Sequence, residues 1–203
     1  MTQGRLIASL LASLALLGGC GSEEGGPSDR EVAARSLLSL RDLPEGATTA
    51  DALPTGLCAP VPILERHGAI ASESQMFAFE RVQVQEAVGV LPNPDIAGFA
   101  YRDLSSNKHH ECIRGAVESF GPERNATVKL LPPRGLGLGD EDAFVRYLIV
   151  RPGEGPVSYI DFVSIRSGKS VAVLILLSRR NPSDAVVREV AGTVARKLAN
   201  ASA

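Results

Sequence analysis

The segment Val171–Leu177 constrains the fold of this 203-residue chain most strongly, because it reads Val-Ala-Val-Leu-Ile-Leu-Leu and contains no polar residue. It is bounded by Ser170 and Ser178, and a short apolar run with such borders is typical of a buried strand. A strand with apolar side chains on both faces must be shielded from water on both sides. The sequence therefore predicts a central strand with a covering layer on each face of its sheet.

Two further strands precede this segment. They are expected over 144–151 and 157–166. The apolar segment lies within a third strand, over 170–178. Glycine and proline mark the turns between them, at 152–156 and 167–168. Because short turns join antiparallel neighbours, these three strands predict a meander.

A helix is expected after the meander. Asn181 is predicted to be its N-cap, and Pro182 suits the first helical position. Apolar residues then recur at helical spacing and predict one buried stripe: Val187, Val190, Val194 and Leu198.

The region before the meander mixes helices with irregular chain. Ser28 and Glu31 match a capping box, which predicts a helix over 29–41. Segment 43–68 holds four prolines and three glycines, so it is expected to be irregular, with a short helical turn over 61–66 as an option.

A strand region follows at 77–90. Its apolar residues change parity near Glu80-Arg81, which indicates either a bulge in one long strand or two strands. A helix is expected to start within 92–95, with apolar residues at helical spacing: Ile96, Phe99, Ala100 and Leu104. A second helix over about 107–119, a strand over 126–131 and a glycine-rich loop over 132–142 follow. This order predicts a single α+β domain over 29–200, with an antiparallel twisted sheet flanked by helices.

The N-terminus has the three parts of a secretion signal. A short head carries Arg5, and Leu6–Leu17 is apolar apart from two serines, which suits a signal and is too short to span a bilayer. Leu17-Gly18-Gly19-Cys20 then resembles the lipobox of bacterial lipoproteins. An ordinary secretory signal with a nearby cysteine is the alternative.

The lipobox resemblance implies that residues 1–19 are removed and that the Cys20 thiol carries a diacylglycerol. Residues 20–28 are small and acidic, which predicts a flexible tether to the membrane. We therefore expect an exported domain that is anchored by lipid, such as palmitate, on the extracytoplasmic side of the cell membrane. Two acyl chains anchor stably, whereas one is reversible.

Export changes the expectation for the two remaining cysteines, Cys58 and Cys112. In an oxidising compartment an even pair is most simply one disulfide. Closing a loop of about 55 residues would stabilise the fold by roughly 4 kcal/mol. A reactive thiol at Cys112, beside His109, His110 and Glu111, is the competing interpretation, although no redox spacing such as CxxC supports it.

Charge and composition exclude nucleic acid as a partner class. The formal net charge is −2, and it becomes −3 if Arg5 leaves with the signal. The chain has no tryptophan, and only 4% of its residues are aromatic. Nucleic-acid binding depends on clustered positive charge, often with aromatic residues, and the chain shows no such cluster.

Several short motifs together resemble the PknH-like extracellular sensor domain family, which also occurs alone in actinobacterial lipoproteins. They are Leu37-Leu38 before Asp42-Leu-Pro-Glu-Gly46, the two cysteines on either side of a Phe-containing strand and a helix, Gly139-Asp140, and Val163-Ser-Ile-Arg-Ser-Gly168. The resemblance covers about 35–200. It implies a sensor-type domain that binds an unidentified ligand in a cleft against an antiparallel sheet, with no catalytic motif. Members often have a second disulfide, for which this chain has no cysteines.

The histidines do not predict a metal site. Adjacent His109 and His110 are not expected on one helix face, and zinc needs more ligands than His109 and Cys112 supply. We therefore expect no metal and no cofactor, and we expect these histidines, like His67, on solvated helix surface.

Catalytic motifs are also missing from the sequence. There is no Gly-x-Ser-x-Gly elbow, and the aspartates at 103, 140, 142 and 161 form no evident pair. Gly135-Leu-Gly-Leu-Gly139 lacks the strand-to-helix setting of a phosphate loop, so we expect a mobile loop, or alternatively a lid over a cleft. Asp161 fits either a solvated position or a polar group at a cleft.

These observations favour a non-enzymatic, lipid-anchored binding or sensor domain. A small apolar ligand is a candidate because the sheet has more Val, Leu and Ile than one core face needs. The alternative is a structural lipoprotein that docks an envelope protein through a flat apolar patch, without a cavity above about 300 Å³. An envelope hydrolase would need a histidine or paired carboxylates converging in a cleft. The sequence alone does not identify ligand-binding residues.

Overall fold

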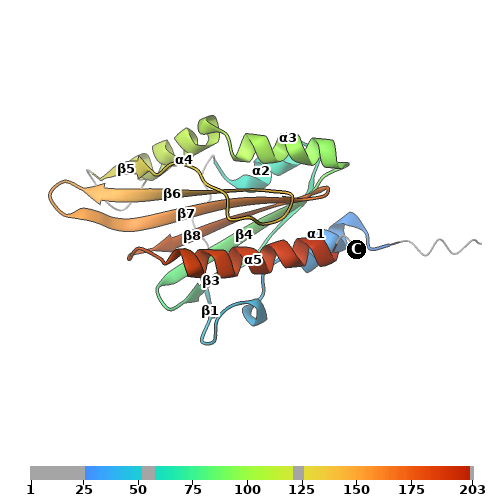
Figure 1. Cartoon of the computed structure of the whole chain (residues 1–203), viewed down its shortest axis with the longest axis horizontal. Helices are drawn as coiled ribbons and strands as arrows, with labels where there is room; N and C mark the ends of the chain where they lie inside the picture. The colour runs from blue at the N-terminus through green and yellow to red at the C-terminus, as the bar shows by residue number, and fades with distance from the viewer. Residues whose placement is uncertain (1–25, 52–57, 121–125, 202–203) are drawn as a thin grey trace, which may run out of the picture.

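The computed structural model describes residues 26–51, 58–120 and 126–201. These residues form three layers, with the sheet between two sets of helices (Figure 1). One face carries α1 (Asp29–Ser36) and α5 (Asp184–Ala201). The other carries α2 (Pro60–Arg66), α3 (Pro94–Leu104) and α4 (Asn107–Phe120). None of the helices in the described ranges is long and apolar enough to cross a membrane.

The sheet is antiparallel and has eight strands in the order β1-β3-β4-β8-β7-β6-β5, with β2 also pairing with β4. The strands are β1 (Thr48–Ala50), β2 (Ile70–Glu73), β3 (Met76–Phe79), β4 (Val82–Val90), β5 (Thr127–Leu130), β6 (Glu141–Arg151), β7 (Gly155–Ser167) and β8 (Ser170–Ser178). The predicted α+β class, the meander and the final helix are confirmed.

The apolar strand β8 is central, between β4 and β7. Its alternate side chains enter different cores. Val171 and Val173 pack with α2 and α3, whereas Leu174 and Leu176 pack with α1 and α5. All four are almost completely buried. The large apolar content of the sheet is therefore explained by two core layers, and it does not itself indicate an apolar ligand.

One helix boundary and two short strands before the meander differ from the sequence-based prediction. The first helix ends at Ser36 and not near residue 41, because Leu37 is extended and the Leu38 amide donates to the Glu86 carboxyl, 2.6 Å away. A separate 3₁₀ turn then covers Leu40–Asp42. The segment expected to be irregular contains strand β1, and β2 was not predicted. The optional helical turn over 61–66 is confirmed as α2.

The parity change near Glu80 reflects two strands. Strands β3 and β4 form a tight hairpin in which Phe79 pairs with Val82. Glu80 lies in the turn with φ of 49°, in the left-handed region. The two-strand option was correct, and the bulge option was not.

A disulfide joins Cys58 to Cys112, with 5.9 Å between their Cα atoms. It ties the residues before α2 to the first half of α4, on one face of the sheet. This is the pairing that the cysteine count predicted.

Candidate functional site

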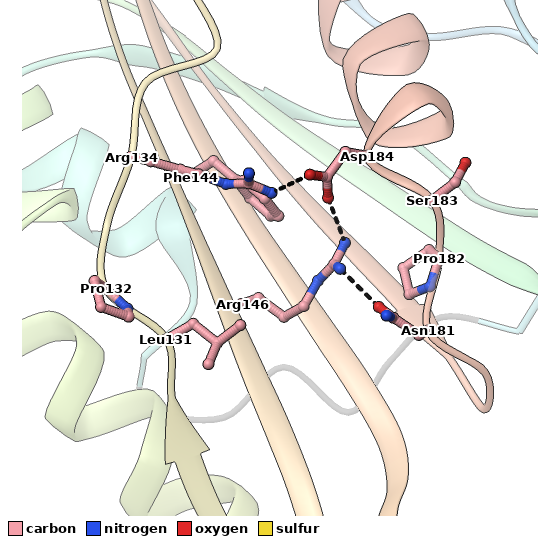
Figure 2. Close-up of a pocket in the computed structure, with 9 residues that line it drawn as sticks. All are labelled: Leu131, Pro132, Arg134, Phe144, Arg146, Asn181, Pro182, Ser183 and Asp184. Atoms are coloured by element: carbon pink, nitrogen blue, oxygen red, sulfur yellow. Dashed lines mark hydrogen bonds and ion pairs between the residues drawn. The ribbon is translucent and has the colours of Figure 1, made fainter.

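A groove of about 560 Å³ lies on the α5 face of the sheet, beside the N-terminus of that helix (Figure 2). Its walls combine apolar, charged and amide side chains: Leu131, Pro132, Arg134, Phe144, Arg146, Asn181, Pro182, Ser183 and Asp184. This volume falls within the range of small-molecule sites, which typically combine apolar walls with a few polar groups.

Strand β6 places Phe144 and Arg146 on the floor of the groove. They are two residues apart, so both face α5. Arg146 is paired across the sheet with Asp161 of β7. Its Nε and Nη2 atoms donate to the two carboxylate oxygens of Asp161, at 2.6 and 2.8 Å. Because Asp161 is fully buried and Arg146 is 8% exposed, this is a bidentate ion pair inside the protein.

The turn between β8 and α5 supplies the second wall. Asn181 accepts a hydrogen bond from Nη1 of Arg146 at 2.7 Å, and Asp184 lies 3.5 Å from Nη2 of the same arginine. The predicted N-cap was wrong: α5 begins at Asp184, and the Ser183 hydroxyl accepts from the Val186 amide. Asn181 instead orients the buried arginine.

The segment after β5 supplies the opposite wall and lies alongside β6. The Leu131 amide donates to the Arg146 carbonyl at 2.9 Å, and Arg134 exchanges two backbone hydrogen bonds with Phe144. This pairing lets Arg134 donate to Asp184 at 2.5 Å, so one ion pair joins the two walls (Figure 2).

Both arginines also contact Phe144. The Cζ atom of Arg134 lies 4.8 Å from the ring centre, and that of Arg146 lies 5.3 Å away. A guanidinium group at this distance is attracted by the aromatic face. The floor of the groove is therefore an aromatic ring covered by two cations.

The two carboxyls respond differently to this setting. The hydrogen bond from Arg134 is the main cause that lowers the pKa of Asp184, and the charges of Arg146 and Arg188 add to it. Burial raises the pKa of Asp161, and the hydrogen bonds from Arg146 oppose that rise. Asp184 therefore stays ionised at the rim, while Asp161 depends on Arg146 to carry its charge.

The glycine-rich loop next to the groove is held by hydrogen bonds and core packing. Both oxygens of Asp142 accept from backbone amides, those of Leu136 and Leu138. Leu136 is buried in the core beneath α5. Gly139 has a positive φ and lies so close to the Arg166 carbonyl that a Cβ would not fit. Leu136 therefore anchors the loop in the core, and this contact argues against a lid over the groove.

The adjacent histidines are buried, which corrects the predicted solvated position. Helix α4 lies against the sheet, and the rings of His109 and His110 both contact Phe162, at 5.2 and 5.8 Å between ring centres. Nδ1 of His110 lies 2.5 Å from the Tyr147 hydroxyl. Burial lowers the pKa of His109 to about 4, so it is neutral at physiological pH. They lie on the face opposite the groove.

His67 and Asp103, two other candidate residues from the sequence, do not line the groove. Nε2 of His67 lies 2.9 Å from Asp103, between α2 and α3. Within the described ranges, no three His, Cys, Asp or Glu side chains are grouped as metal ligands. Cys20 lies outside the described residues, so its lipidation remains a prediction.

Sequence motifs could not identify this site, because its residues come from three separate segments. One signal was present: Arg146 and Asp161 are opposite charges at inward positions of two neighbouring predicted strands. Asp161 was a candidate cleft residue from the sequence, whereas Arg134, Arg146 and Asp184 were not predicted.

Comparison with known proteins gives a structural match only. No family model matches the chain, and no curated protein matches its sequence. The fold is similar to the extracellular domain of PknH from Mycobacterium tuberculosis, with a TM-score of 0.56 and 10% sequence identity. The match covers 84% of this chain and 96% of that domain. The predicted PknH-like fold is thereby confirmed, and at this identity the similarity concerns the fold alone.

Proposed function

We propose that the chain is an extracytoplasmic, lipid-anchored sensor-type domain that binds a small molecule in the groove beside α5. The observation that carries this proposal is the buried Arg146–Asp161 pair on the groove floor. Removing two charges from water costs several kcal/mol per ion, and a pair of apolar residues often stabilises a core as well or better. Because stability alone does not require such a pair, its position on the groove floor supports a role in ligand binding.

The alternative, a structural lipoprotein, has less support. It predicts a flat apolar patch without a sizeable cavity, whereas the groove holds about 560 Å³. Within ranges 26–51, 58–120 and 126–201, the large exposed apolar residues come from different parts of the fold: Leu40, Ile70, Phe99 and Leu131. Leu131 is itself a wall of the groove.

Leu131→Trp tests the binding proposal. Leu131 is 39% exposed and lines the groove, so a larger side chain should fill the space without disturbing the core. We expect mass spectrometry of denatured, membrane-extracted protein to detect a small molecule with the unaltered chain and to lose it with the variant.

Leu40→Trp is the matched control, since Leu40 is 44% exposed and lies in the 3₁₀ turn, outside the groove. It should retain the bound molecule. Equal loss from both variants, or no bound molecule in any sample, would count against the groove as a ligand site.

Cys20 provides a separate test of the anchor. We expect the mature protein to begin at Cys20 and to carry a diacylglycerol, which metabolic labelling with an alkyne fatty acid would reveal. Cys20→Ser should abolish the label and release the protein from the membrane fraction, while Cys58→Ser should retain the label. A mature N-terminus at Cys20 without lipid would refute the anchor.

A further inference from the structure

The groove lies at a positively charged end of an otherwise acidic chain. Arg134 and Arg146 face Asp161 and Asp184, so these four charges balance. The adjoining turn adds exposed Arg179 and Arg180, and the charge of Arg188 in the first turns of α5 also reaches Asp184. The whole chain has a formal net charge of −2, so this excess of arginines is local. A local excess of one sign concentrates ligands of the opposite sign.

The two groove arginines differ in their availability. Arg146 is 8% exposed and uses Nε, Nη1 and Nη2 on Asp161 and Asn181. Arg134 is 52% exposed, and among the described residues its side chain has a single hydrogen-bond acceptor, Asp184. Arg134 is therefore the cation that a ligand can reach.

Asp184 occupies the position that a ligand carboxylate would take. It accepts from a half-exposed guanidinium that rests on an aromatic ring, at the mouth of a groove. If it were displaced from Arg134, Asp184 would keep Arg146 as a neighbour, 3.5 Å from its Oδ1. After this exchange, Arg134 would be paired with the ligand and Asp184 with Arg146. Asp184 is also 49% exposed, so water can solvate its charge.

The remaining walls of the groove suit an apolar chain. Leu131 and Pro132 are exposed on one wall, and Pro182 forms part of the other. Apolar surface here is small and adjoins the charged rim, so a purely apolar molecule would leave the arginine unused.

We propose that the groove binds a small amphipathic anion, whose carboxylate or phosphate replaces Asp184 on Arg134 and whose apolar part contacts Leu131 and Pro132. This inference rests on the proposed function, because it names the ligand class of the same groove.

The position of the groove favours a free ligand over a headgroup in the bilayer surface. The predicted tether leads into α1, which packs beside the C-terminal half of α5, where Lys197 bonds Asp42 at 2.7 Å. The groove is lined by residues at the N-terminus of α5, and Figure 1 shows α1 beside the opposite end of that helix. A helix of 18 residues is about 27 Å long, so the groove is separated from the tethered end.

Four eight-carbon probes test the ligand class with the purified full chain: octanoate, octyl phosphate, octanol and octylammonium. Isothermal titration should show that the two anions bind at least about tenfold more tightly than octanol, since charge-assisted bonds to arginine are strong. Arg134→Gln should weaken octanoate about tenfold and leave octanol unchanged, whereas Asp184→Asn should strengthen octanoate by removing its competitor.

Arg102→Gln is the matched control for lost charge. Arg102 also covers an aromatic ring, with its Cζ 4.7 Å from the centre of Phe99, but it belongs to α3 on the opposite face. Its replacement should leave octanoate affinity unchanged.

Contrary outcomes separate this inference from the proposed function. Equal affinity for octanol and octanoate, with no effect of Arg134→Gln, would refute an anionic ligand and leave the groove as an apolar site. Preference for octylammonium, weakened by Asp184→Asn, would overturn it in favour of a cation. Binding only to vesicles that contain phosphatidylglycerol, and to none of the four probes, would show that the groove binds a lipid headgroup and would refute a free ligand. Loss of the co-purified molecule in Leu131→Trp is independent of these results.

Discussion

Replacing Asp161 by Ala should lower the free energy of unfolding by about 3–5 kcal/mol. The substitution leaves the Arg146 guanidinium buried without its bidentate partner, and Arg146 is only 8% exposed. Asn181 accepts from Nη1 and Asp184 lies 3.5 Å from Nη2, so neither replaces the lost bond from Nε. Urea unfolding monitored by circular dichroism measures the effect.

Glu154→Ala is the control for this prediction. Glu154 pairs with Arg151 at 3.1 Å in the exposed turn between β6 and β7, where an ion pair contributes at most about 1 kcal/mol. Its loss should therefore change stability little. If Asp161→Ala costs no more than Glu154→Ala, Arg146 must reach water in the unaltered protein, and the buried pair does not exist.

A double replacement, Arg146→Met with Asp161→Leu, separates stability from binding. Apolar pairs of similar volume often match or exceed a buried ion pair in stability. We expect this variant to unfold at least as late in urea as the unaltered chain, but to lose the small molecule from its groove. Retention of that molecule would contradict a binding role for the pair.

The fold could be predicted where one periodic pattern determined the structure. Val171–Leu177 required a covered strand whichever residues surrounded it, and the stripe of α5 from Val187 to Leu198 is buried as expected. Segments whose conformation depends on a distant partner were predicted less well. The first helix continues in the sequence pattern beyond Ser36, but the Glu86 carboxyl binds the Leu38 amide and ends it.

The site was hidden because strand register is not visible in the sequence. Counting back from the last pair of the hairpin, Arg151 and Gly155, would place Arg146 opposite Ile160, whereas the register shift between Ile149 and Val150 places it opposite Asp161. A shift of one residue changes which side chains lie opposite one another. Likewise, the sequence Asn181-Pro182 is typical of a helix start. In the structure, however, the Asn181 side chain accepts a hydrogen bond from Arg146 and does not cap α5.

Glu86 is the basis of the second large effect. It lies between Val84 and Val88 on the α1 and α5 face of β4 and is 1% exposed. Its Oε2 atom accepts from the Leu38 amide at 2.6 Å, while Oε1 has no hydrogen-bond partner within the described ranges. The alternation of valines predicted the strand correctly, and it also places this acid at an inward position.

Burial raises the pKa of Glu86 from 4.5 to about 8, against the opposing effects of the Leu38 hydrogen bond and the Lys197 charge, and Asp42 adds slightly to the rise. A carboxyl with a higher pKa in the folded state binds its proton more tightly there than in the unfolded chain. The contribution of Glu86 to the free energy of unfolding therefore falls as the pH rises from 4.5 to about 8. At about 1.4 kcal/mol per pKa unit, the loss approaches about 5 kcal/mol.

Glu86→Gln should remove this part of the pH dependence. The glutamine carbonyl can still accept from Leu38, but its amide cannot ionise, and burying that amide without an acceptor costs about 1–3 kcal/mol. The variant should therefore be less stable than the unaltered chain at pH 5 and more stable at pH 9, as measured by urea unfolding. Glu189→Gln removes an exposed carboxyl of α5 and should keep the original pH dependence. If the stability curves of Glu86→Gln and the unaltered chain run parallel from pH 5 to 9, Glu86 does not titrate in this range and its carboxyl is hydrated in the folded protein.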